Sequence, residues 1–429
     1  MSSDAPTSVV APRSVESSSP EQPKARPRKA WRAWLVVGLV CFLLCEGVTR
    51  GLTSTASANG MPRITRFPLV PYRPSAEQVQ EHLSDGSRKP GDYFVFDSAL
   101  GWSVGPSGTS RRKGEVLATS NAQGVRAASD RVYATAPPAG KLRIVTVGDS
   151  FTHCDEVRND ETWQHFLESG ADDLEVLNLG VGGYGSDQAY LRWKREGSEF
   201  TSDIVILGIW PEDLCRNVNV VRYYLTPDGN YLSKPRFIFR DDELALVNSP
   251  VLHGAPLAEA LAAPEECALL EHDFWANPSE TQQSWTHSSR TWRSFQSVFA
   301  LFRRKAIRQQ LYSGHDTTAI DITVGIAEAF SRDVAATGAI PVVLLIPMRD
   351  LLPMHTGAEK FPLVTALESA GVNVVDLGPT FGREVEARSG AGLYMPGGHH
   401  SAEGNRLLSE ALAEALSPFL AEAREKRGQ

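Results

Sequence analysis

The chain has 429 residues, of which 42% are hydrophobic and 22% charged, an ordinary globular composition that allows one large domain or two smaller ones. Its net charge is −8; the first 32 residues hold six Lys/Arg and three Asp/Glu, so the remainder carries −11. This acidic remainder argues against nucleic-acid binding, because such affinity comes mainly from basic side chains on phosphates. Five cysteines are too few and too scattered for a disulfide scaffold, although Cys154, Cys215 and Cys267 could include one disulfide.

The N-terminal region has the pattern of a membrane anchor. Residues 1–29 are rich in Ser, Pro and Ala without an apolar period, which predicts a disordered tail that ends in a basic cluster. The uncharged run Ala33 to Cys45 is short for a bilayer, but residues 30–49 reach the required ~20 residues when Arg32 and Glu46 lie at the membrane surfaces. Because positive charge stays in the cytoplasm, we expect a single-pass protein of the cell membrane whose body faces the outer side.

Two other interpretations of this region are open. A cleaved signal peptide has an apolar region of about 7–15 residues, and the "ASA" sequence at residues 56–58 resembles a cleavage site. That sequence lies well beyond the apolar run, which favours the uncleaved anchor. The third interpretation is a buried helix of a soluble domain, and the basic flank argues against it.

Strands and helices alternate in the main domain, residues 141–425, while residues 50–140 predict an irregular exported segment that packs on it. Strands are expected at Leu142–Val147, Leu174–Leu179, Asp203–Ile209, Ile340–Ile346 and Val372–Leu377. Helices are expected near Glu161–Leu167 with Asp160 as cap, at Asp187–Glu196, over Ile320–Val334 and over Leu407–Leu416. Continuous apolar strands between helices predict a parallel sheet covered on both faces, with the site at the carboxyl ends of its strands.

Residues 218–318 interrupt this alternation. Within them, Lys234 to Asn248 predicts a small hairpin and Ser294 to Leu311 an amphipathic helix. We expect an insertion that borders the site and selects the substrate, since loops on a rigid scaffold often carry such roles.

Ser150 is the first candidate for chemistry. It follows Gly148 and Asp149 at the end of the first strand, where glycine permits a tight turn. A serine at the first turn of a helix can be a nucleophile, because the helix N-terminus favours a developing negative charge. The alternative is a helix cap with no chemical role.

Polar or glycine-rich turns follow the next two strands. The stretch "NLGVGGYGSDQ" (Asn178 to Gln188) frees the backbone to offer N–H groups as an oxyanion hole, or is only a flexible turn. The stretch "GIWPEDLCRN" (Gly208 to Asn217) offers Glu212 and Asp213, which accept rather than donate hydrogen bonds when ionised.

Two adjacent histidines precede the last helix, in "YMPGGHHSAEGNRLL" (Tyr394 to Leu408). A histidine there can reach the serine across the top of the sheet and act as its base. They could instead be ordinary loop residues beside a cap at Ser401. A two-histidine metal site is conceivable, but adjacent histidines rarely face one ion and no third ligand is close, so we expect neither a metal nor a cofactor.

The order of these motifs resembles the SGNH hydrolases, also called GDSL-type esterases. The motifs "GDSF", "GVGGYG", "GIWPEDL" and "GGHHSAEGN" correspond to the four blocks of the family. The upstream pieces "DSALGWSVGPS" (Asp97 to Ser107) and "SNAQGVRA" (Ser120 to Ala127) are similar to bacterial membrane-anchored members. The resemblance implies a flavodoxin-like, doubly wound α/β fold with a five-stranded parallel sheet, in addition to the N-terminal transmembrane helix.

The resemblance also implies roles for individual residues. Ser150 is the nucleophile, His399 is the base because Gly404 follows it by five residues, and the N–H groups of Ser150 and Gly183 form the oxyanion hole. Two positions depart from the pattern. Gly397 stands two residues before His399, where the family has an orienting Asp, so that Asp376 or another acid would have to substitute. Glu212 stands at the Asn of the oxyanion hole and would repel an oxyanion unless it is protonated or turned away.

These features predict a membrane-anchored serine hydrolase that cleaves small acyl esters through an acyl-serine intermediate, with an acylated envelope glycan as one candidate substrate. A polysaccharide O-acyltransferase of the same fold is the alternative enzyme. The two departures keep open a third hypothesis, a carbohydrate-binding protein on a hydrolase scaffold that has lost catalysis.

Overall fold

The computed structural model describes residues 30–54, 61–65, 67–85, 92–227, 231–282, 284–347, 349, 360–388 and 392–428. The predicted tail 1–29 and the "ASA" sequence at 56–58 lie outside the described residues. The chain divides into two compact units, Met1–Gly51 and Leu52–Gln429.

Helix α1 (Ala30–Leu52) dominates the first unit. Its 23 residues give a length of roughly 34 Å at 1.5 Å per residue, and the stretch from Trp31 to Leu52 is apolar enough to cross a membrane. Near its end, Arg50 forms an ion pair with Glu46 one turn earlier, at 2.7 Å. The expected apolar helix is therefore present, and its length suits a bilayer whose hydrocarbon core is about 30 Å thick.

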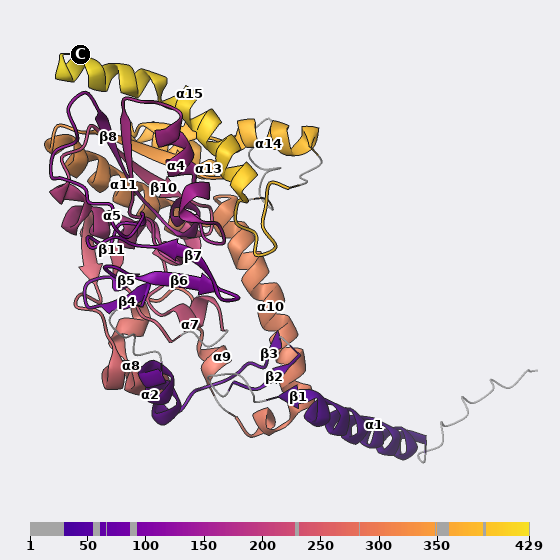
Figure 1. Ribbon diagram of the computed structural model, residues 1–429. Helices are drawn as coiled ribbons and strands as arrows, with labels where there is room; N and C mark the ends of the chain where they lie inside the picture. Colours follow the sequence, from indigo (N-terminus) through magenta and orange to yellow (C-terminus); the bar gives the residue numbers. More distant parts are fainter. Residues whose placement is uncertain are drawn as a thin grey trace, which may run out of the picture. The chain divides into compact units, whose positions relative to one another are not determined.

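The second unit contains a five-stranded parallel sheet, of which β8 and β10 are labelled in Figure 1. Its strands are β8 (Leu142–Val147), β9 (Leu174–Asn178), β10 (Ile204–Ile209), β13 (Ile340–Leu345) and β14 (Val374–Asp376). Their spatial order is β14-β13-β10-β8-β9, and every neighbouring pair is parallel. Counted along the chain this is the order 2-1-3-4-5 of flavodoxin-like folds. The predicted fold class is thus confirmed.

Helices cover both faces of the sheet because successive strand residues point to opposite sides. On β8, Leu142 and Ile144 join one core and Val145 and Val147 the other. The first core is covered by α4 (Trp163–Ser169), α14 (Gly378–Ala387) and α15 (Ala402–Arg427). The second is covered by α5 (Ser186–Arg195), α11 (Thr318–Ala336) and α13 (Pro362–Ser369). The predicted cap of α4 was wrong: Asp160 lies in a preceding turn of 3₁₀ helix, and Thr162 accepts the hydrogen bond from His165 N instead.

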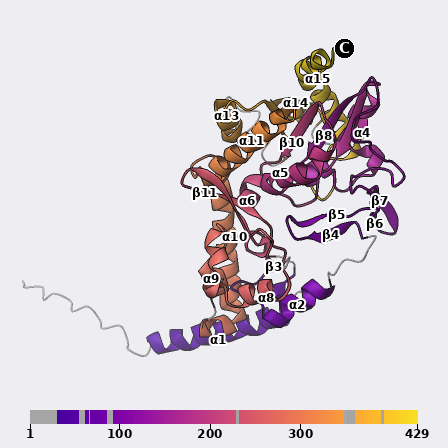
Figure 2. The same cartoon turned by 90° about the vertical axis from the view of Figure 1, so that its left-hand side faces the viewer.

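The inserted residues form the expected hairpin and helix together with shorter pieces. In chain order they are α7 (Arg222–Leu225), β11 (Arg236–Arg240), β12 (Glu243–Val247), α8 (Gly254–Ala262), α9 (Pro278–Thr281) and α10 (Arg290–Tyr312). Figure 2 shows α10 extending from the sheet region toward α9 and β3. The insertion is joined to α5 by an ion pair between Lys234 and Asp187, whose side chains are both fully buried.

The segment upstream of the sheet is more regular than its composition predicts. It contains a three-stranded sheet of β1 (Thr53–Ser54), β2 (Arg63–Ile64) and β3 (Phe67–Pro68), helix α2 (Ala76–Asp85), and the hairpins β4–β5 (Phe94–Asp97, Gly101–Val104) and β6–β7 (Thr109–Arg112, Glu115–Thr119). Strands of two to five residues are too short to display a periodicity in the sequence, which is why composition alone suggested an irregular segment. All five cysteines are free thiols, so none forms the disulfide considered above.

The Lys234–Asp187 pair generates a stability prediction. Burial lowers the pKa of Lys234 and raises that of Asp187 despite their mutual attraction. Removing one partner leaves an unpaired buried charge, so we expect Asp187→Ala to reduce the free energy of unfolding by about 3–5 kcal/mol. Chemical unfolding followed by fluorescence measures this loss.

Two controls sharpen that measurement. The double variant Asp187→Leu/Lys234→Met removes both charges and should lose clearly less stability than Asp187→Ala. The exposed pair Lys360–Glu368 supplies the surface control, since Glu368→Ala should leave unfolding almost unchanged. Equal losses for the buried and the exposed pair would contradict the prediction.

Candidate active site

Ser150 opens a short helix at the carboxyl end of β8. The turn before it admits only glycine, because a Cβ on Gly148 would lie 2.1 Å from Thr152 Oγ1 and 2.7 Å from Gly208 O. Asp149 caps helix α3 (Ser150–His153) by accepting a hydrogen bond from Phe151 N at 2.8 Å. The capping role considered for Ser150 is thus filled by its neighbour, and the Ser150 hydroxyl is left for other contacts.

His399 lies against that hydroxyl. Its Nε2 is 2.9 Å from Ser150 Oγ, and its Nδ1 is 3.1 Å from Glu156 Oε2. The loop that carries His399 ends where Ser401 caps α15 by accepting from Gly404 N at 3.1 Å. A Cβ on Gly404 would lie 2.2 Å from Leu393 O, so glycine is required at the position that set the register of the motif.

Glu156 is the acid that the sequence analysis did not identify. Its carboxylate also accepts a 2.7 Å hydrogen bond from Arg112, which comes from β6. A Cβ on Gly397 would lie 2.3–2.6 Å from the carboxyl atoms of Glu156, so the Glu156 carboxylate occupies the space that a side chain at 397 would need. Burial raises the pKa of Glu156, but hydrogen bonds from Arg112 and His399 lower it below its ordinary value, which keeps the carboxylate ionised.

The backbone turns sharply to bring Glu156 to this place. Cys154 has φ 64° and Glu156 has φ 75°, a region that non-glycine residues seldom adopt and that is often found at functional sites. The only signal in the sequence was the pair of carboxylates, Asp155 and Glu156, that follows the GDS motif closely. Nothing in their spacing tells which of them reaches a histidine far along the chain.

The other acid considered for this role has a different contact. Asp376, at the end of β14, accepts a 2.9 Å hydrogen bond from Gly378 N at the start of α14. We expected Asp376 or another acid at His399 Nδ1; the acid found there is Glu156, so Asp376 is corrected as a candidate for this position.

The second histidine of the pair points into the core. His400 is buried and packs against the rings of Phe151, Phe381 and Tyr394. Burial, assisted by the neighbouring His399, lowers its pKa to about 3, so it is neutral at physiological pH. Of the two adjacent histidines, the one that contacts Ser150 is His399.

The glycine-rich loop lies beside the serine and is held from outside. Gly183 has φ 81° in a turn closed by a hydrogen bond from Tyr184 N to Val181 O. Trp102 Nε1 donates to Gly182 O and Arg222 donates to Gly183 O, both at 2.9 Å. These two hydrogen bonds hold the carbonyls of Gly182 and Gly183 in place. Among the described residues no acceptor contacts the N–H of Gly183, so that N–H can donate to a ligand.

Glu212 is bound to helix α10. Its carboxylate accepts a 3.0 Å hydrogen bond from Arg308 Nη2 and another from the Tyr312 hydroxyl, both from α10. Burial raises the pKa of Glu212, but Arg308 and Tyr312 lower it below its ordinary value. The position that the family resemblance assigns to an oxyanion donor therefore holds an ionised acid committed to the insertion, and Glu212 is corrected as a member of the oxyanion hole.

Arg216, one turn further along α6 (Asp213–Asn217), connects three loops at the sheet edge. Its Nη1 donates to Asp149 Oδ2 at 2.9 Å, to Tyr184 O at 2.8 Å and to Asp213 Oδ1 at 3.0 Å. The side chains of Arg216, Asp149 and Asp213 are all buried. Burial and the neighbouring Asp149 raise the pKa of Asp213 well above its ordinary value, whereas Arg216 acts to lower it.

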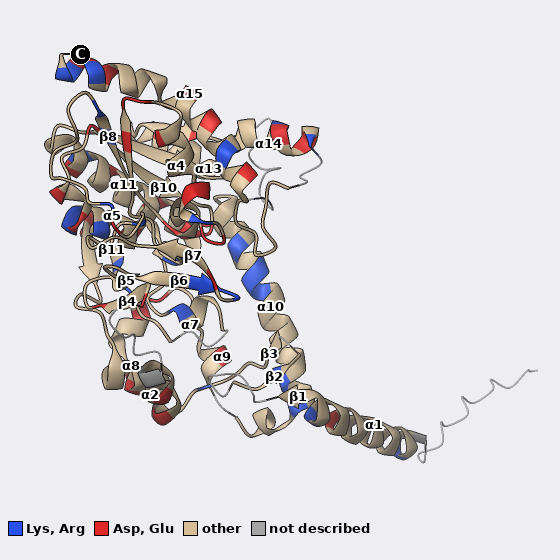
Figure 3. Cartoon of the chain, in the orientation of Figure 1, with Lys and Arg blue, Asp and Glu red and all other residues tan. Residues whose placement is uncertain are grey.

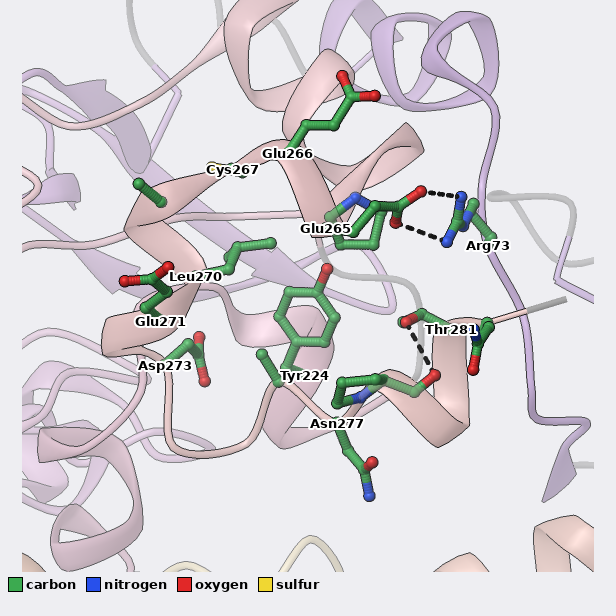
Figure 4. A pocket seen from close by; sticks show the side chains of 15 residues that line it. Arg73, Tyr224, Glu265, Glu266, Cys267, Leu270, Glu271, Asp273, Asn277 and Thr281 are labelled. Atoms are coloured by element: carbon green, nitrogen blue, oxygen red, sulfur yellow. Dashed lines mark hydrogen bonds and ion pairs between the residues drawn. The ribbon is translucent and has the colours of Figure 1, made fainter.

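A separate pocket of about 750 Å³ lies in the insertion and is lined by several acidic residues (Figure 4). Two of its carboxylates are engaged within the protein: Glu265 forms a two-bond ion pair with Arg73, and Asp273 accepts from the backbone of Val220 and Val221. Among the residues that the structure describes, no group of three or more His, Cys, Asp or Glu could hold a metal ion.

No family model and no curated protein matches the sequence. Among solved structures, the chain is similar to a lipolytic G-D-S-L protein from Veillonella parvula (11% identity, TM-score 0.30, 64% of this chain and 98% of the other). It is also similar to an acetylxylan esterase variant from Geobacillus stearothermophilus (11%, 0.34, 65% and 95%) and to a psychrotrophic esterase from Pseudoalteromonas sp. (10%, 0.33, 66% and 100%). At these scores the fold class stands on the strand order, and the function on the geometry of the site.

The contact between Glu156 and the space at Gly397 gives a reciprocal test. Glu156→Ala should lower the rate of ester cleavage by up to about 10⁴, the loss seen when the orienting acid of a triad fails. Gly397→Asp alone should also lower it, because a second carboxylate would collide with Glu156 and repel it. The double variant Glu156→Ala/Gly397→Asp should recover part of the lost rate, measured as kcat/KM on a small aryl ester.

Asp376→Asn serves as the control and should leave kcat/KM within a few-fold of the parent. A gain of rate in Gly397→Asp alone, or a larger loss in Asp376→Asn than in Glu156→Ala, would contradict the assignment of Glu156.

Proposed function

We propose that this protein is a membrane-anchored serine hydrolase of the SGNH type that cleaves small acyl esters. The observation that carries the proposal is the line of contacts from Ser150 Oγ to His399 Nε2 and from His399 Nδ1 to Glu156. A hydroxyl, an imidazole and an ionised carboxylate at these distances have the geometry of a triad, in which the acid holds the tautomer that leaves Nε2 free to accept a proton.

The reaction follows from the roles of these atoms. Ser150 Oγ attacks the ester carbonyl carbon while His399 Nε2 takes the hydroxyl proton, and the carbonyl oxygen becomes an oxyanion. The N–H groups of Ser150 and Gly183 stabilise that oxyanion. The intermediate then collapses, the C–O bond to the alcohol breaks, and His399 returns the proton to the departing alkoxide. Water repeats the sequence on the acyl-serine and releases the acid.

The complete relay favours an enzyme over a scaffold that has lost catalysis. Two departures supported a purely carbohydrate-binding protein. At Gly397 the missing carboxylate is replaced by that of Glu156, and the carboxylate of Glu212 is bound by Arg308 of α10. Ser150 is only 5% exposed, and Phe151 stacks on Trp210 beside it with ring centroids 4.6 Å apart. This confinement favours a small acyl group, for which an acylated envelope glycan is a suitable carrier.

The choice between hydrolysis and acyl transfer depends on the acceptor of the acyl-serine. We propose water, and product analysis in the presence of an added oligosaccharide tests this choice. Free acid as the main product supports a hydrolase, whereas an acylated oligosaccharide as the main product would identify an acyltransferase.

Replacement of the nucleophile tests the chemistry directly. Ser150→Ala should abolish ester cleavage, a loss on the order of 10⁶ in turnover for a triad nucleophile, and should abolish labelling by a fluorophosphonate probe. His399→Ala should have the same effect on cleavage. The matched control is Ser169→Ala on the exposed end of α4, which should keep both. Unchanged labelling of the purified Ser150→Ala protein would place the reactive group elsewhere.

The proposed anchor predicts a topology. The basic cluster before Ala33 should hold the N-terminus inside the cell, with residues 141–425 outside, because positively charged flanks stay in the cytoplasm. Protease added to intact cells should digest the body and spare the first 30 or so residues, as read by antibodies to tags at each end. A fully protected body, or a mature chain that begins near Asn59, would defeat the anchor.

A further inference from the structure

Helix α10 presents an apolar face to solvent. Its exposed large side chains are Trp292, Phe295, Val298, Phe299, Leu301 and Phe302, which we call the α10 face. Phe299 and Phe302 are 73% and 66% exposed, values far above those of core residues. The positions 292, 295, 299 and 302 repeat at three and four residues, so they form one stripe along the helix.

This concentration is peculiar to α10. Of the fifteen large apolar side chains that are exposed in the described part of the second unit, seven lie between Trp285 and Phe302. The others are scattered singly, as on most soluble surfaces. A contiguous exposed patch rimmed by polar residues marks a surface that binds a partner or a membrane.

An apolar groove of about 640 Å³ continues the α10 face. One side of the groove is lined by α10 residues, among them Val298 and Leu301. The other side is lined by Ile64 of β2, Phe67 of β3 and Leu69, which follows β3. Phe67 is itself 53% exposed. The apolar surface is therefore shared between the helix and the small sheet β1–β2–β3.

That small sheet begins where the candidate span ends. Helix α1 ends at Leu52, and Thr53 of β1 pairs directly with Ile64 of β2. Paired strands lie about 5 Å apart, so the groove-lining Ile64 is one strand spacing from the residue at which the chain leaves α1. If α1 crosses a bilayer, the groove is held next to the surface of that bilayer by the covalent chain.

The charge of α10 fits the same partner. The helix carries six Arg/Lys and no Asp/Glu, whereas the chain beyond residue 32 has a net charge of −11 (Figure 3). Arg303 and Arg304 pair with Glu280 and Arg308 pairs with Glu212, while Lys305 is exposed and lines the groove. Trp and Phe on one face with basic residues beside them are typical of helices that lie in a membrane interface and attract anionic lipids.

From these observations we propose that the α10 face and its groove rest on the lipid bilayer in which α1 is anchored. The proposal depends on the anchor proposed above. It adds a second point of attachment, which would fix how the catalytic body is oriented toward the membrane surface.

Fluorescence quenching by spin-labelled lipids tests the contact in the full chain. The protein is reconstituted in vesicles of phosphatidylcholine and phosphatidylglycerol that contain a phospholipid with a nitroxide on its acyl chain. Cys41, Cys45 and Cys267 are replaced by Ser, and one environment-sensitive fluorophore is attached to Phe299→Cys. A fluorophore at Leu39→Cys in α1 reports the anchor, and one at Glu414→Cys, an exposed position of α15, reports the aqueous phase.

We expect the fluorophore at 299 to be quenched about twofold or more, like that at 39, while the one at 414 is unaffected. Quenching at 39 alone overturns the proposal and leaves the anchor intact. Absence of quenching at both positions overturns the anchor and the proposal that depends on it. A fluorophore at 299 that is shielded from aqueous iodide but not quenched by lipid would mean that protein, such as a second copy, covers the face, and this also overturns the proposal.

A set of surface variants provides the matched control. With the fluorophore at 299, the triple variant Trp292→Ser/Phe295→Ser/Phe302→Ser should reduce quenching toward the level at 414, since it removes three exposed apolar side chains of the α10 face. The variant Val116→Ser/Val132→Ser removes exposed apolar side chains elsewhere and should leave quenching unchanged.

Discussion

One buried guanidinium fixes the positions on which the site depends. Arg216 donates to Asp149, which caps the helix of Ser150, to the carbonyl of Tyr184 beside Gly183, and to Asp213 after the third strand. Each contact belongs to a different loop at the carboxyl edge of the sheet, so one cation sets the distance between the serine and the glycine turn. Without it two buried carboxylates would face each other unpaired, a situation that costs several kcal/mol in proteins.

Two residues of the candidate site lie on the same loop. Ser150 and Glu156 lie six residues apart, so only His399 has to come from a distant part of the chain. The left-handed turn at Cys154 is held by Arg126, which donates to the carbonyls of Cys154 and Val157 at 2.7 and 2.6 Å. Arg126 and Trp102 come from the upstream pieces that the sequence analysis singled out. Those pieces therefore support the site through hydrogen bonds to the loop after Ser150 and to the glycine-rich loop.

The sequence was most informative where a single periodicity or motif determines the outcome. Five apolar strands were predicted to within two residues at each end, because a strand buried on both faces leaves a continuous apolar run. The contact of His399 with Ser150 agreed with a register read from Gly404. The role of Glu156 was not predicted, because its partner His399 lies 243 residues away and its backbone conformation leaves no pattern in the sequence. The exposure of the α10 face escaped as well, since an amphipathic pattern does not reveal whether its apolar side meets a core or solvent.

The two departures from the family pattern share one physical explanation. At each, a carboxylate is held by an arginine from a segment outside the sheet: Arg112 of the upstream hairpin binds Glu156, and Arg308 of α10 binds Glu212. The first ion pair holds an acid against the imidazole while the acid stays charged. The second holds the carboxylate of Glu212 on α10. Read as isolated motif positions, a glycine and a glutamate suggest lost function. Read with their arginine partners, they describe a site in which one carboxylate is held at the histidine and the other on α10, which is the distribution of charge that the proposed reaction at Ser150 requires.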